Sequence, residues 1–259
     1  MPDFLDLLAE EAKKTVEDGY YNVVGKVDAA STSMKEAILS FEGAPVISEV
    51  KFASPSAGTI RRNQDLTVIT KEMQEGGAVG ISLLTEPKHF KGQIYYLTAI
   101  RGEVRVPVLM KDIIISPAQI EAAYRSGADA VLLIYSLFER GYGEIELADM
   151  IDLSHSRGLE VLLEVHGEDE FLSAVETDAD MIGINNRDLK TLEVDLGVTQ
   201  RILMKYPPKN RVIVSESGIK GPDDIRFLFD CGANAFLVGT AIMEASSIIK
   251  KLEELVGAI

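Results

Sequence analysis

Short, continuous apolar runs alternate with longer amphipathic segments along most of the chain. The apolar runs predict eight strands, at residues 45–51, 79–85, 106–111, 130–135, 160–165, 181–185, 211–215 and 235–238. Several of them, such as Val131-Leu-Leu-Ile134, show no polar alternation, which is typical of parallel strands covered by helices on both faces. The pattern therefore indicates an α/β fold built on a parallel sheet.

The segments between the runs carry helix start and stop signals. Pro117 opens one amphipathic segment that ends at Gly127, and Pro222 opens another that ends near Gly232. Proline in the first turn and glycine just past the last turn is the usual asymmetry of helix ends. Three strands follow directly on a Gly-Ala pair, which predicts a left-handed glycine that ends the preceding helix. The third such pair begins at Gly77.

Eight regular strand–helix units favour closure of the sheet into a single (β/α)₈ TIM barrel with extra N-terminal helices. The competing fold is an open, doubly wound sheet. No linker or low-complexity stretch divides the 259 residues, so we expect one domain. Within it, residues 1–43 form a helical extension that covers the lower end or the flank of the barrel, and residues 44–259 form the barrel.

Composition narrows the function. The chain has 26 basic and 41 acidic residues, a net charge of −15, and 46% hydrophobic residues. Such an acidic chain is not expected to bind nucleic acid, which requires a basic surface. A small anionic substrate remains compatible, because a few local cations and backbone N–H groups outweigh a distant negative field.

Targeting and metal signals are missing from the sequence. The start of the chain lacks a basic segment followed by an apolar run, and no apolar segment reaches the length of a membrane span. We therefore expect a cytoplasmic protein without membrane partners, and favour a monomer over a dimer. The single cysteine, Cys231, is expected to be a small buried filler, and the three histidines show no metal-ligand spacing. His166 precedes a helix-start signal and is expected to be a polar loop residue.

Charged residues stand at the carboxyl ends of the predicted strands, where barrel enzymes carry their active sites. They are two lysines and three glutamates, namely Lys51, Lys111, Glu49, Glu164 and Glu216. Each lies beside a run that is apolar enough to be core. Charges next to a wall of low dielectric constant have perturbed pKa values, which suits them to proton transfer. This set predicts an acid–base active site.

A phosphate site is predicted beside it. Ser217 and Gly218 follow the seventh strand, and Gly239 and Thr240 follow the eighth. Loops after these two strands, together with a helix N-terminus, form the recurrent phosphate-binding site of TIM barrels. We found no Gly-Lys-Ser/Thr phosphate loop and no Gly-x-Gly-x-x-Gly dinucleotide motif in the sequence.

These residues resemble the indole-3-glycerol phosphate synthase family. The resemblance runs from about residue 45 to 245 and is carried by strings that occur in the expected order: Glu49-Val-Lys51 with Ser54-Pro-Ser56, Ile81-Ser-Leu-Leu-Thr-Glu86 with Phe90 and Gly92, Pro107-Val-Leu, Lys111-Asp-Ile-Ile, Gly127-Ala-Asp-Ala-Val-Leu-Leu-Ile134, Leu163-Glu-Val-His166, Gly183-Ile-Asn-Asn-Arg-Asp-Leu189 and Ser215-Glu-Ser-Gly-Ile219.

The resemblance implies a reaction and the residues that perform it. The reaction is ring closure of 1-(2-carboxyphenylamino)-1-deoxyribulose 5-phosphate with loss of carbon dioxide and water, and it implies no cofactor and no metal. Lys111 would be the general acid, Lys51 and Glu49 would position the substrate, and Glu164 would act in the dehydration. The other implied site residues are Asn185, Glu216 and Arg187, which support this network; Ser217, Gly218, Gly239 and Thr240 at the phosphate; Phe90 with Leu132 or Leu237 at the aromatic ring; and Ser54 in the first loop.

The sequence departs from the family pattern after the first strand and around the third. Phe52, Ala53 and Ala57 stand where basic residues are common, Met110 replaces a residue that is often basic, and Ile113 replaces an aromatic residue. The proposed acids and bases are untouched. Because fewer cations surround the anionic substrate, we expect the first loop to bind it more weakly.

Two other functions remain open at this point. A phosphoribosyl-anthranilate isomerase, or a similar sugar-phosphate isomerase, would use the same scaffold with one acid and one base. A phosphate-ligand binding module would bind without turnover. The set of lysines and glutamates fits a decarboxylating condensation better than either alternative.

Overall fold

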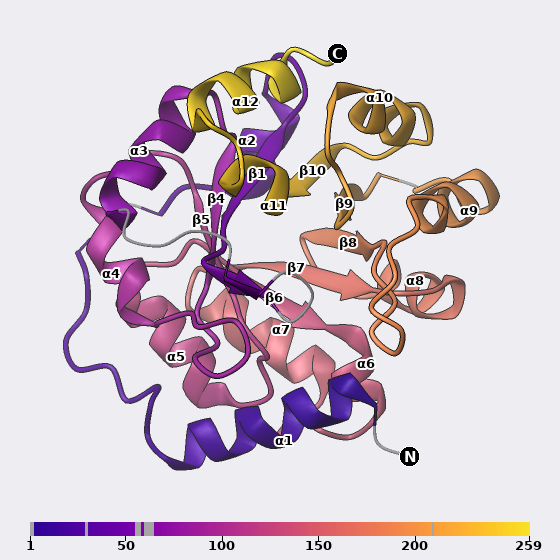
Figure 1. Cartoon of the computed structure of the whole chain (residues 1–259). Helices are drawn as coiled ribbons and strands as arrows, with labels where there is room; N and C mark the ends of the chain where they lie inside the picture. Colours follow the sequence, from indigo (N-terminus) through magenta and orange to yellow (C-terminus); the bar gives the residue numbers. More distant parts are fainter. Residues whose placement is uncertain (1–2, 29–30, 55–57, 60–64, 209) are drawn as a thin grey trace.

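Eight parallel strands form a closed barrel in the computed structural model, which describes all residues except 1–2, 29–30, 55–57, 60–64 and 209 (Figure 1). The barrel strands are β1 (Val46–Val50), β4 (Gly80–Leu84), β5 (Val108–Lys111), β6 (Ala130–Ile134), β7 (Glu160–Val165), β8 (Met181–Asn185), β9 (Val212–Glu216) and β10 (Ala235–Val238). The barrel closes at β1, the first strand, which pairs with both β4 and β10. Ile47 is aligned with Gly80 of β4 and with Leu237 of β10. The TIM barrel is confirmed, and an open sheet is excluded.

The continuous apolar runs are explained by burial on both faces of each strand. In β6, Ala130, Leu132 and Ile134 belong to the cluster of side chains inside the barrel, whereas Val131 and Leu133 pack under the surrounding helices. All five residues of this strand are buried. Alternate residues therefore fill two separate layers of core, so neither layer requires polar positions.

Helices surround the barrel, as the ring of ribbons in Figure 1 shows. They are α3 (Leu66–Glu75), α4 (Tyr95–Arg101), α5 (Pro117–Ser126), α6 (Tyr135–Glu139), α7 (Leu147–Ser156), α8 (Glu168–Ala174), α9 (Gly197–Lys205), α10 (Pro222–Asp230), α11 (Thr240–Met243) and α12 (Ile248–Val256). The predicted Gly-Ala turns are confirmed, because Gly77, Gly127 and Gly232 all have positive φ, at 90°, 85° and 105°. Each lets the chain reverse from a helix into the next strand.

Two helices precede the barrel, α1 (Phe4–Glu17) and α2 (Met34–Leu39). The start of α2 binds the amino end of β7, where the Glu160 carboxylate accepts hydrogen bonds from the backbone N–H groups of Met34 (2.7 Å) and Lys35 (3.1 Å). Helix α2 therefore packs at the amino ends of the strands. Helix α1 lies instead at the other end, where its Leu5 and Leu8 line the main cavity.

Three further features complete the fold. A short antiparallel hairpin, β2 (Ala53–Ser54) with β3 (Gly58–Thr59), follows β1 and was not predicted.

Cys231 is only half-buried, so the prediction that it is a buried filler is wrong. It caps the C-terminus of α10 on the outer ring and does not enter the core. None of the helices in the described residues is long and apolar enough to cross a membrane.

Candidate functional site

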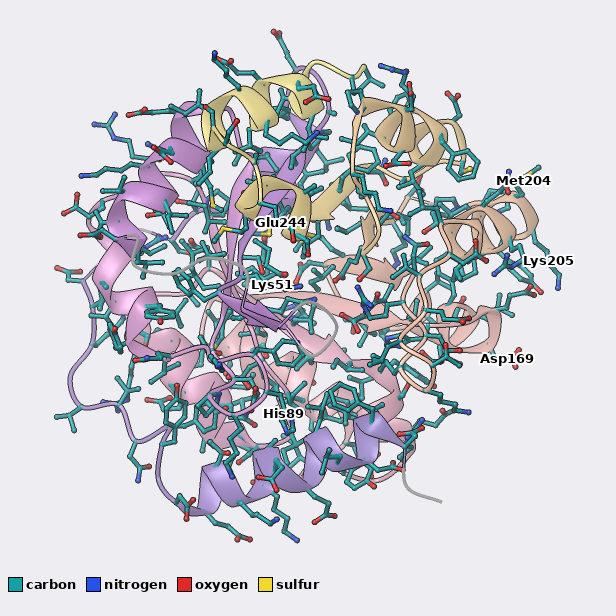
Figure 2. The ribbon with its side chains drawn as sticks, viewed as in Figure 1. Lys51, His89, Asp169, Met204, Lys205 and Glu244 are labelled. Carbon is teal, nitrogen blue, oxygen red and sulfur yellow. The ribbon has the colours of Figure 1, made fainter. Side chains whose placement is uncertain are left out.

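The carboxyl ends of the strands surround a cavity of about 960 Å³ that contains most of the predicted site residues. Figure 2 shows Lys51 close to the middle of the ring, whereas Lys205 lies at its periphery. Thirteen predicted residues line the cavity: Glu49, Lys51, Phe90, Lys111, Glu164, Asn185, Arg187, Glu216, Ser217, Gly218, Leu237, Gly239 and Thr240. Leu132, the alternative to Leu237, lines it too. The barrel topology thus brings together residues that are up to 191 positions apart in the sequence, from Glu49 to Thr240.

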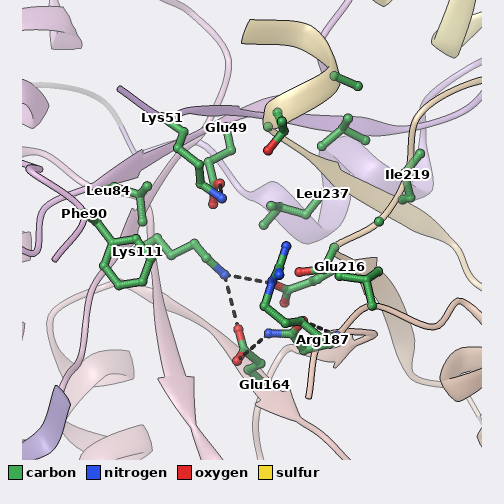
Figure 3. Close-up of a pocket in the computed structure, with 18 of the residues that line it drawn as sticks. Glu49, Lys51, Leu84, Phe90, Lys111, Glu164, Arg187, Glu216, Ile219 and Leu237 are labelled. Carbon is green, nitrogen blue, oxygen red and sulfur yellow. Dashed lines mark hydrogen bonds and ion pairs between the residues drawn. The ribbon is translucent and has the colours of Figure 1, made fainter. Parts of the chain in front are cut away.

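Lys111 lies between two carboxylates at the centre of this cavity (Figure 3). Its Nζ atom is 2.8 Å from Oε2 of Glu216 and 3.2 Å from Oε2 of Glu164. Burial on its own would lower the pKa of Lys111, but the negative charges of Glu216, Glu164 and Glu49 outweigh it and raise the pKa. The lysine is therefore a firmly charged ammonium group, which is the protonated form that a general acid requires.

The two carboxylates beside Lys111 have different environments. Burial raises the pKa of Glu164, but Lys111, His166 and the amide of Asn185, which donates to Oε1 at 3.0 Å, outweigh it and hold the pKa well below its usual range. For Glu216, burial and the charges of Glu164 and Glu49 prevail over the attraction of Lys111, so its pKa is raised. The pair combines one firmly ionised carboxylate with one that accepts a proton readily, which is the pattern expected of acid–base catalysts.

A second ion pair lies on β1. Lys51 Nζ is 2.7 Å from Oε1 of Glu49, whose side chain is 2% exposed. Glu49 Oε2 is buried without a hydrogen-bond partner among the described residues. A buried carboxylate oxygen without a partner is costly unless a ligand or water satisfies it. Both residues are on the same face of the strand, so this pair faces the cavity, as predicted from their spacing.

Two glycines that were not predicted as positioning elements make room for these carboxylates. A Cβ atom on Gly183 of β8 would lie 2.2 Å from Oε1 of Glu216. A Cβ atom on Gly239 would lie 2.8 Å from Oε1 of Glu49, so this residue has a role beyond the expected phosphate contact. The carboxylates therefore occupy space that any other residue type would fill.

The loop after β9 contains two successive residues in the left-handed region of the backbone. Ser217 and Gly218 have positive φ values of 66° and 90°. Such a conformation costs a non-glycine residue roughly 1–2 kcal/mol, and strain of this kind concentrates at functional sites. The side-chain amide of Asn186 stabilises the turn by donating to the carbonyls of Glu216 (2.8 Å) and Ser217 (3.3 Å). Asn186 is a supporting residue that the sequence motif contained but that was not singled out.

Apolar side chains also line the cavity. Phe90, Leu132 and Leu237, which the resemblance implied, are among them, together with Phe4 and Leu8 of α1. The loop that carries Phe90 is ordered by the Glu86 carboxylate, which accepts from the backbone N–H groups of residues 88, 89 and 90 at 2.7–2.8 Å. The contribution of α1 was missed, because an amphipathic pattern shows that a face is buried without showing what covers it.

The structure describes only part of the first loop. The backbone of Ser54 lies in β2, and Ser56 and Ala57 are outside the described residues, so the proposed contacts of the first loop remain predictions.

His166 lies in the loop between β7 and α8, as expected. Its side chain is only 14% exposed, however, and its ring lies beside the carboxylates of Glu164 and Glu170, which the sequence did not indicate.

The family model of indole-3-glycerol phosphate synthase matches residues 7–255, which is almost the entire chain. The chain belongs to this family. Among its relatives, the indole-3-glycerol phosphate synthase of Thermoanaerobacter sp. (strain X514) is 39% identical over 257 residues and covers 97% of this chain and 96% of its own. The synthases of Koribacter versatilis and Methanopyrus kandleri are each 43% identical, covering 83% and 87% of this chain and 81% and 89% of their own.

Similarity to solved structures extends beyond the indole-3-glycerol phosphate synthase family. A thiamine phosphate pyrophosphorylase from Pyrococcus furiosus superposes with a TM-score of 0.60 at 18% identity, covering 86% of this chain and 96% of its own. At this level of identity the match shows a shared fold alone. Family membership therefore comes from the sequence relatives, and the barrel geometry agrees with it.

Proposed function

We propose that this chain is an indole-3-glycerol phosphate synthase that converts 1-(2-carboxyphenylamino)-1-deoxyribulose 5-phosphate to indole-3-glycerol phosphate, carbon dioxide and water. The observation that carries the proposal is Lys111, an ammonium group held by Glu164 and Glu216 at the centre of the cavity and accompanied by the Lys51–Glu49 pair. Family membership supports the same reaction.

In the first step, the aromatic carbon that carries the carboxylate attacks the ribulose carbonyl carbon. Lys111 donates a proton to the carbonyl oxygen, which becomes a hydroxyl group. A positioned acid of this kind contributes about 10²–10⁴-fold to the rate. The carbon–carboxylate bond then breaks, carbon dioxide leaves, and the bonding electrons restore the aromatic ring.

In the last step, the new hydroxyl takes a proton from Lys51 and leaves as water, and the carbon next to the nitrogen loses a proton to the carboxylate of Glu164. We assign Glu164 to this dehydration because its carboxylate is buried, ionised and 3.2 Å from Lys111. Lys51 and Glu49 position the substrate and assist the later proton transfers. Asn185 and Glu216 keep Glu164 and Lys111 in place through the contacts described above.

The remaining residues bind the two ends of the substrate. The backbone N–H groups of Ser217, Gly218, Gly239 and Thr240 are assigned to the phosphate, since positive-φ residues and a helix start direct N–H groups toward an anion. Phe90 and Leu237 pack on the aromatic ring, Arg187 supports the acid–base network, and Ser54 contacts the substrate from the first loop. We also propose a monomer that works in the cytoplasm.

The direct test is to incubate the protein with the carboxyphenylamino substrate and follow the appearance of indole fluorescence. A second arm supplies phosphoribosyl-anthranilate, the substrate of the alternative isomerase. We expect turnover in the first arm only. Absence of a signal at high enzyme concentration would rule out synthase activity, turnover in the second arm would identify an isomerase, and tight binding without turnover would identify a binding module.

A further inference from the structure

A second cavity, of about 530 Å³, lies behind the candidate active site. Asn185 and Arg187 line both cavities and so form part of the partition between them. The lining of the second cavity also includes His166 at the end of β7 and Glu170 in the first turn of α8. Neither residue has a role in the proposed mechanism, although both are close to its central carboxylate.

A continuous line of titratable groups connects this second cavity to Lys111. Lys111 Nζ is 3.2 Å from Oε2 of Glu164, and Oε1 of Glu164 is 3.1 Å from Nε2 of His166. On the other side of the ring, Nδ1 of His166 is 3.7 Å from Oε2 of Glu170. The two oxygens of Glu164 thus face two different cations, and the two ring nitrogens of His166 face two different carboxylates.

From Glu164 outward to the second cavity, the exposure of the side chains increases. The side chain of Glu164 is 4% exposed, that of His166 is 14% exposed, and that of Glu170 is 19% exposed. Glu170 is held in position by Ser136 Oγ, which donates to it at 2.6 Å, and by the backbone N–H of His166, which donates at 2.8 Å. The line therefore leads from the partly exposed carboxylate of Glu170 to the buried carboxylate of Glu164 through the imidazole ring of His166.

The proposed reaction requires a proton from outside. The substrate carboxylate leaves as neutral carbon dioxide and a hydroxyl group leaves as water, so one proton is consumed in every turnover. Lys111 donates a proton in the first step and must recover it before the next. The substrate that occupies the main cavity covers Lys111 from the side of the mouth, so a second route from solvent is useful.

We propose that Glu170 and His166 form a proton relay that returns a proton from solvent in the second cavity to Lys111 through Glu164. The imidazolium of His166 first donates its Nε2 proton to Oε1 of Glu164, and Glu164 transfers a proton from Oε2 to the neutral amine of Lys111. The ring, now neutral, reorients and takes up a proton from Glu170, which has received it from water. At the end, each protein group has its starting charge, and one solvent proton has replaced the one given to the substrate.

The charges around His166 are compatible with this role. Burial on its own would lower the pKa of His166, but Glu164 and Glu170 outweigh it and raise the pKa to about 9. Asp188, in the loop after β8, adds a third negative charge on this side. Arg140, which follows α6 and lines the same cavity, is neutralised by Asp3 and Asp6 at 2.8 Å each. The ring is therefore protonated at neutral pH, as a proton donor to Glu164 must be.

A purely structural role would require His166 to act as a fixed tie between two carboxylates. Both ring nitrogens are buried, yet neither meets hydrogen-bond geometry with any described residue, despite the short distance to Glu164. A tie would be expected to be well aligned, whereas a relay ring has to reorient between its two partners. His166 never touches the substrate in this scheme, so it is a positioning residue that acts through Glu164.

The test compares His166→Gln with the wild-type enzyme and with His155→Gln. His155 is a matched control, because it also pairs with a carboxylate, with its Nε2 2.9 Å from Oδ2 of Asp180, but it lies on α7 away from both cavities. We expect His166→Gln to lower kcat by about 10-fold to 100-fold, at or below the low end of what a proton donor in direct contact with the substrate contributes, with KM unchanged within about twofold. His155→Gln should behave like the wild type.

Two readouts separate a relay from a tie. The wild-type kcat should fall as pH rises through about 9, where the imidazolium loses its proton, and this alkaline limb should be absent from His166→Gln. In His166→Ala, added imidazole should enter the vacated space beside the second cavity and restore kcat. Glu170→Gln, which keeps the shape of the side chain but accepts only one of its two hydrogen bonds and cannot carry the proton, should reduce kcat in the same direction.

The proposal rests on the proposed function, and the two fail in different ways. If the wild type shows no synthase turnover, the proposed function itself is wrong. If the wild type is active and His166→Gln keeps its kcat and its alkaline limb, the relay is wrong. A loss of kcat with an unchanged pH profile and no rescue by imidazole would also overturn the relay and leave His166 as a structural tie.

Discussion

The fit between Gly183 and Glu216 leads to a sharp prediction about the substitution Gly183→Ala. The new Cβ atom would lie 2.2 Å from Oε1 of Glu216, whereas real Cβ contacts essentially never fall below 3.0 Å. The carboxylate must therefore move by at least 0.8 Å, because Gly183 is fixed in β8 by its pairing with Glu164 on β7 and Val214 on β9. That movement pulls Glu216 away from Lys111, which it contacts at 2.8 Å.

The magnitude follows from the contact that is lost. A hydrogen bond to a charged group is worth about 1.5–3 kcal/mol, which corresponds to roughly 10-fold to 150-fold in rate if the contact is needed in the transition state. A displacement of about 1 Å at a catalytic group costs a similar factor, on the order of 10². We therefore expect kcat/KM for Gly183→Ala to fall by about 10²-fold, mostly through kcat, because the substitution touches the acid rather than the substrate.

The assay is steady-state kinetics of indole formation, with Gly102→Ala as the control. Gly102 ends α4 with φ −79°, and nothing lies within 4 Å of an added Cβ, so this variant should retain full activity. On a Glu216→Asp background, whose shorter side chain leaves more room, Gly183→Ala should cost less than it does alone. If Gly183→Ala remained within twofold of Gly102→Ala, the glycine would not be what positions Glu216.

Three further predictions test other parts of the molecule. Lys111→Ala should lower kcat by about 10²–10⁴-fold and change KM much less, and an unchanged kcat in steady-state kinetics would show that another group is the acid. Gly218→Ala, which combines φ 90° with a Cβ 2.4 Å from Val194 Cγ1, should displace the phosphate turn and raise KM by about tenfold, with wild-type KM as the contrary result. Asp129→Ala should lower the free energy of unfolding by about 3–5 kcal/mol in urea titrations, because it removes a buried carboxylate that pairs with Arg101 at 2.6 Å and accepts a hydrogen bond from the backbone N–H of Val108 at 2.8 Å. It should leave kcat unchanged at temperatures where the protein is folded, and a large loss of kcat there would argue against a purely structural role.

The positions of the catalytic candidates were predictable because barrel topology is simple. Once the apolar runs are recognised as parallel strands of one closed barrel, the residue at the end of each run must face the same opening. Lys111 at the end of β5 and Glu216 at the end of β9 are 105 residues apart, yet they meet at 2.8 Å. To predict that these two residues are neighbours, only the order of the strands along the chain is needed, and the hydrophobic pattern indicates that order.

Features that depend on strand register or on side-chain direction were not predictable. The closeness of Gly183 to Glu216 arises because β8 and β9 align Gly183 with Val214 and Asn185 with Glu216, and a shift of one residue would remove it. The contact of His166 with Glu170 depends on how the chain turns between β7 and α8. Neither the apolar pattern nor the residue types specify these offsets, so the relay residue looked like an ordinary loop residue in the sequence.

Helix α1 has a consequence for how substrate range can change in this family. The groups assigned to proton chemistry all come from the repeating strands, whereas Phe4, Leu5 and Leu8 of α1 supply part of the wall of the main cavity. The helix is tied to the barrel by surface pairs such as Lys88 with Glu11, at 2.7 Å. Substitutions in α1 can therefore reshape the space for the aromatic end of a ligand without disturbing a single proton donor, which makes this helix the place to begin engineering acceptance of bulkier ring substituents.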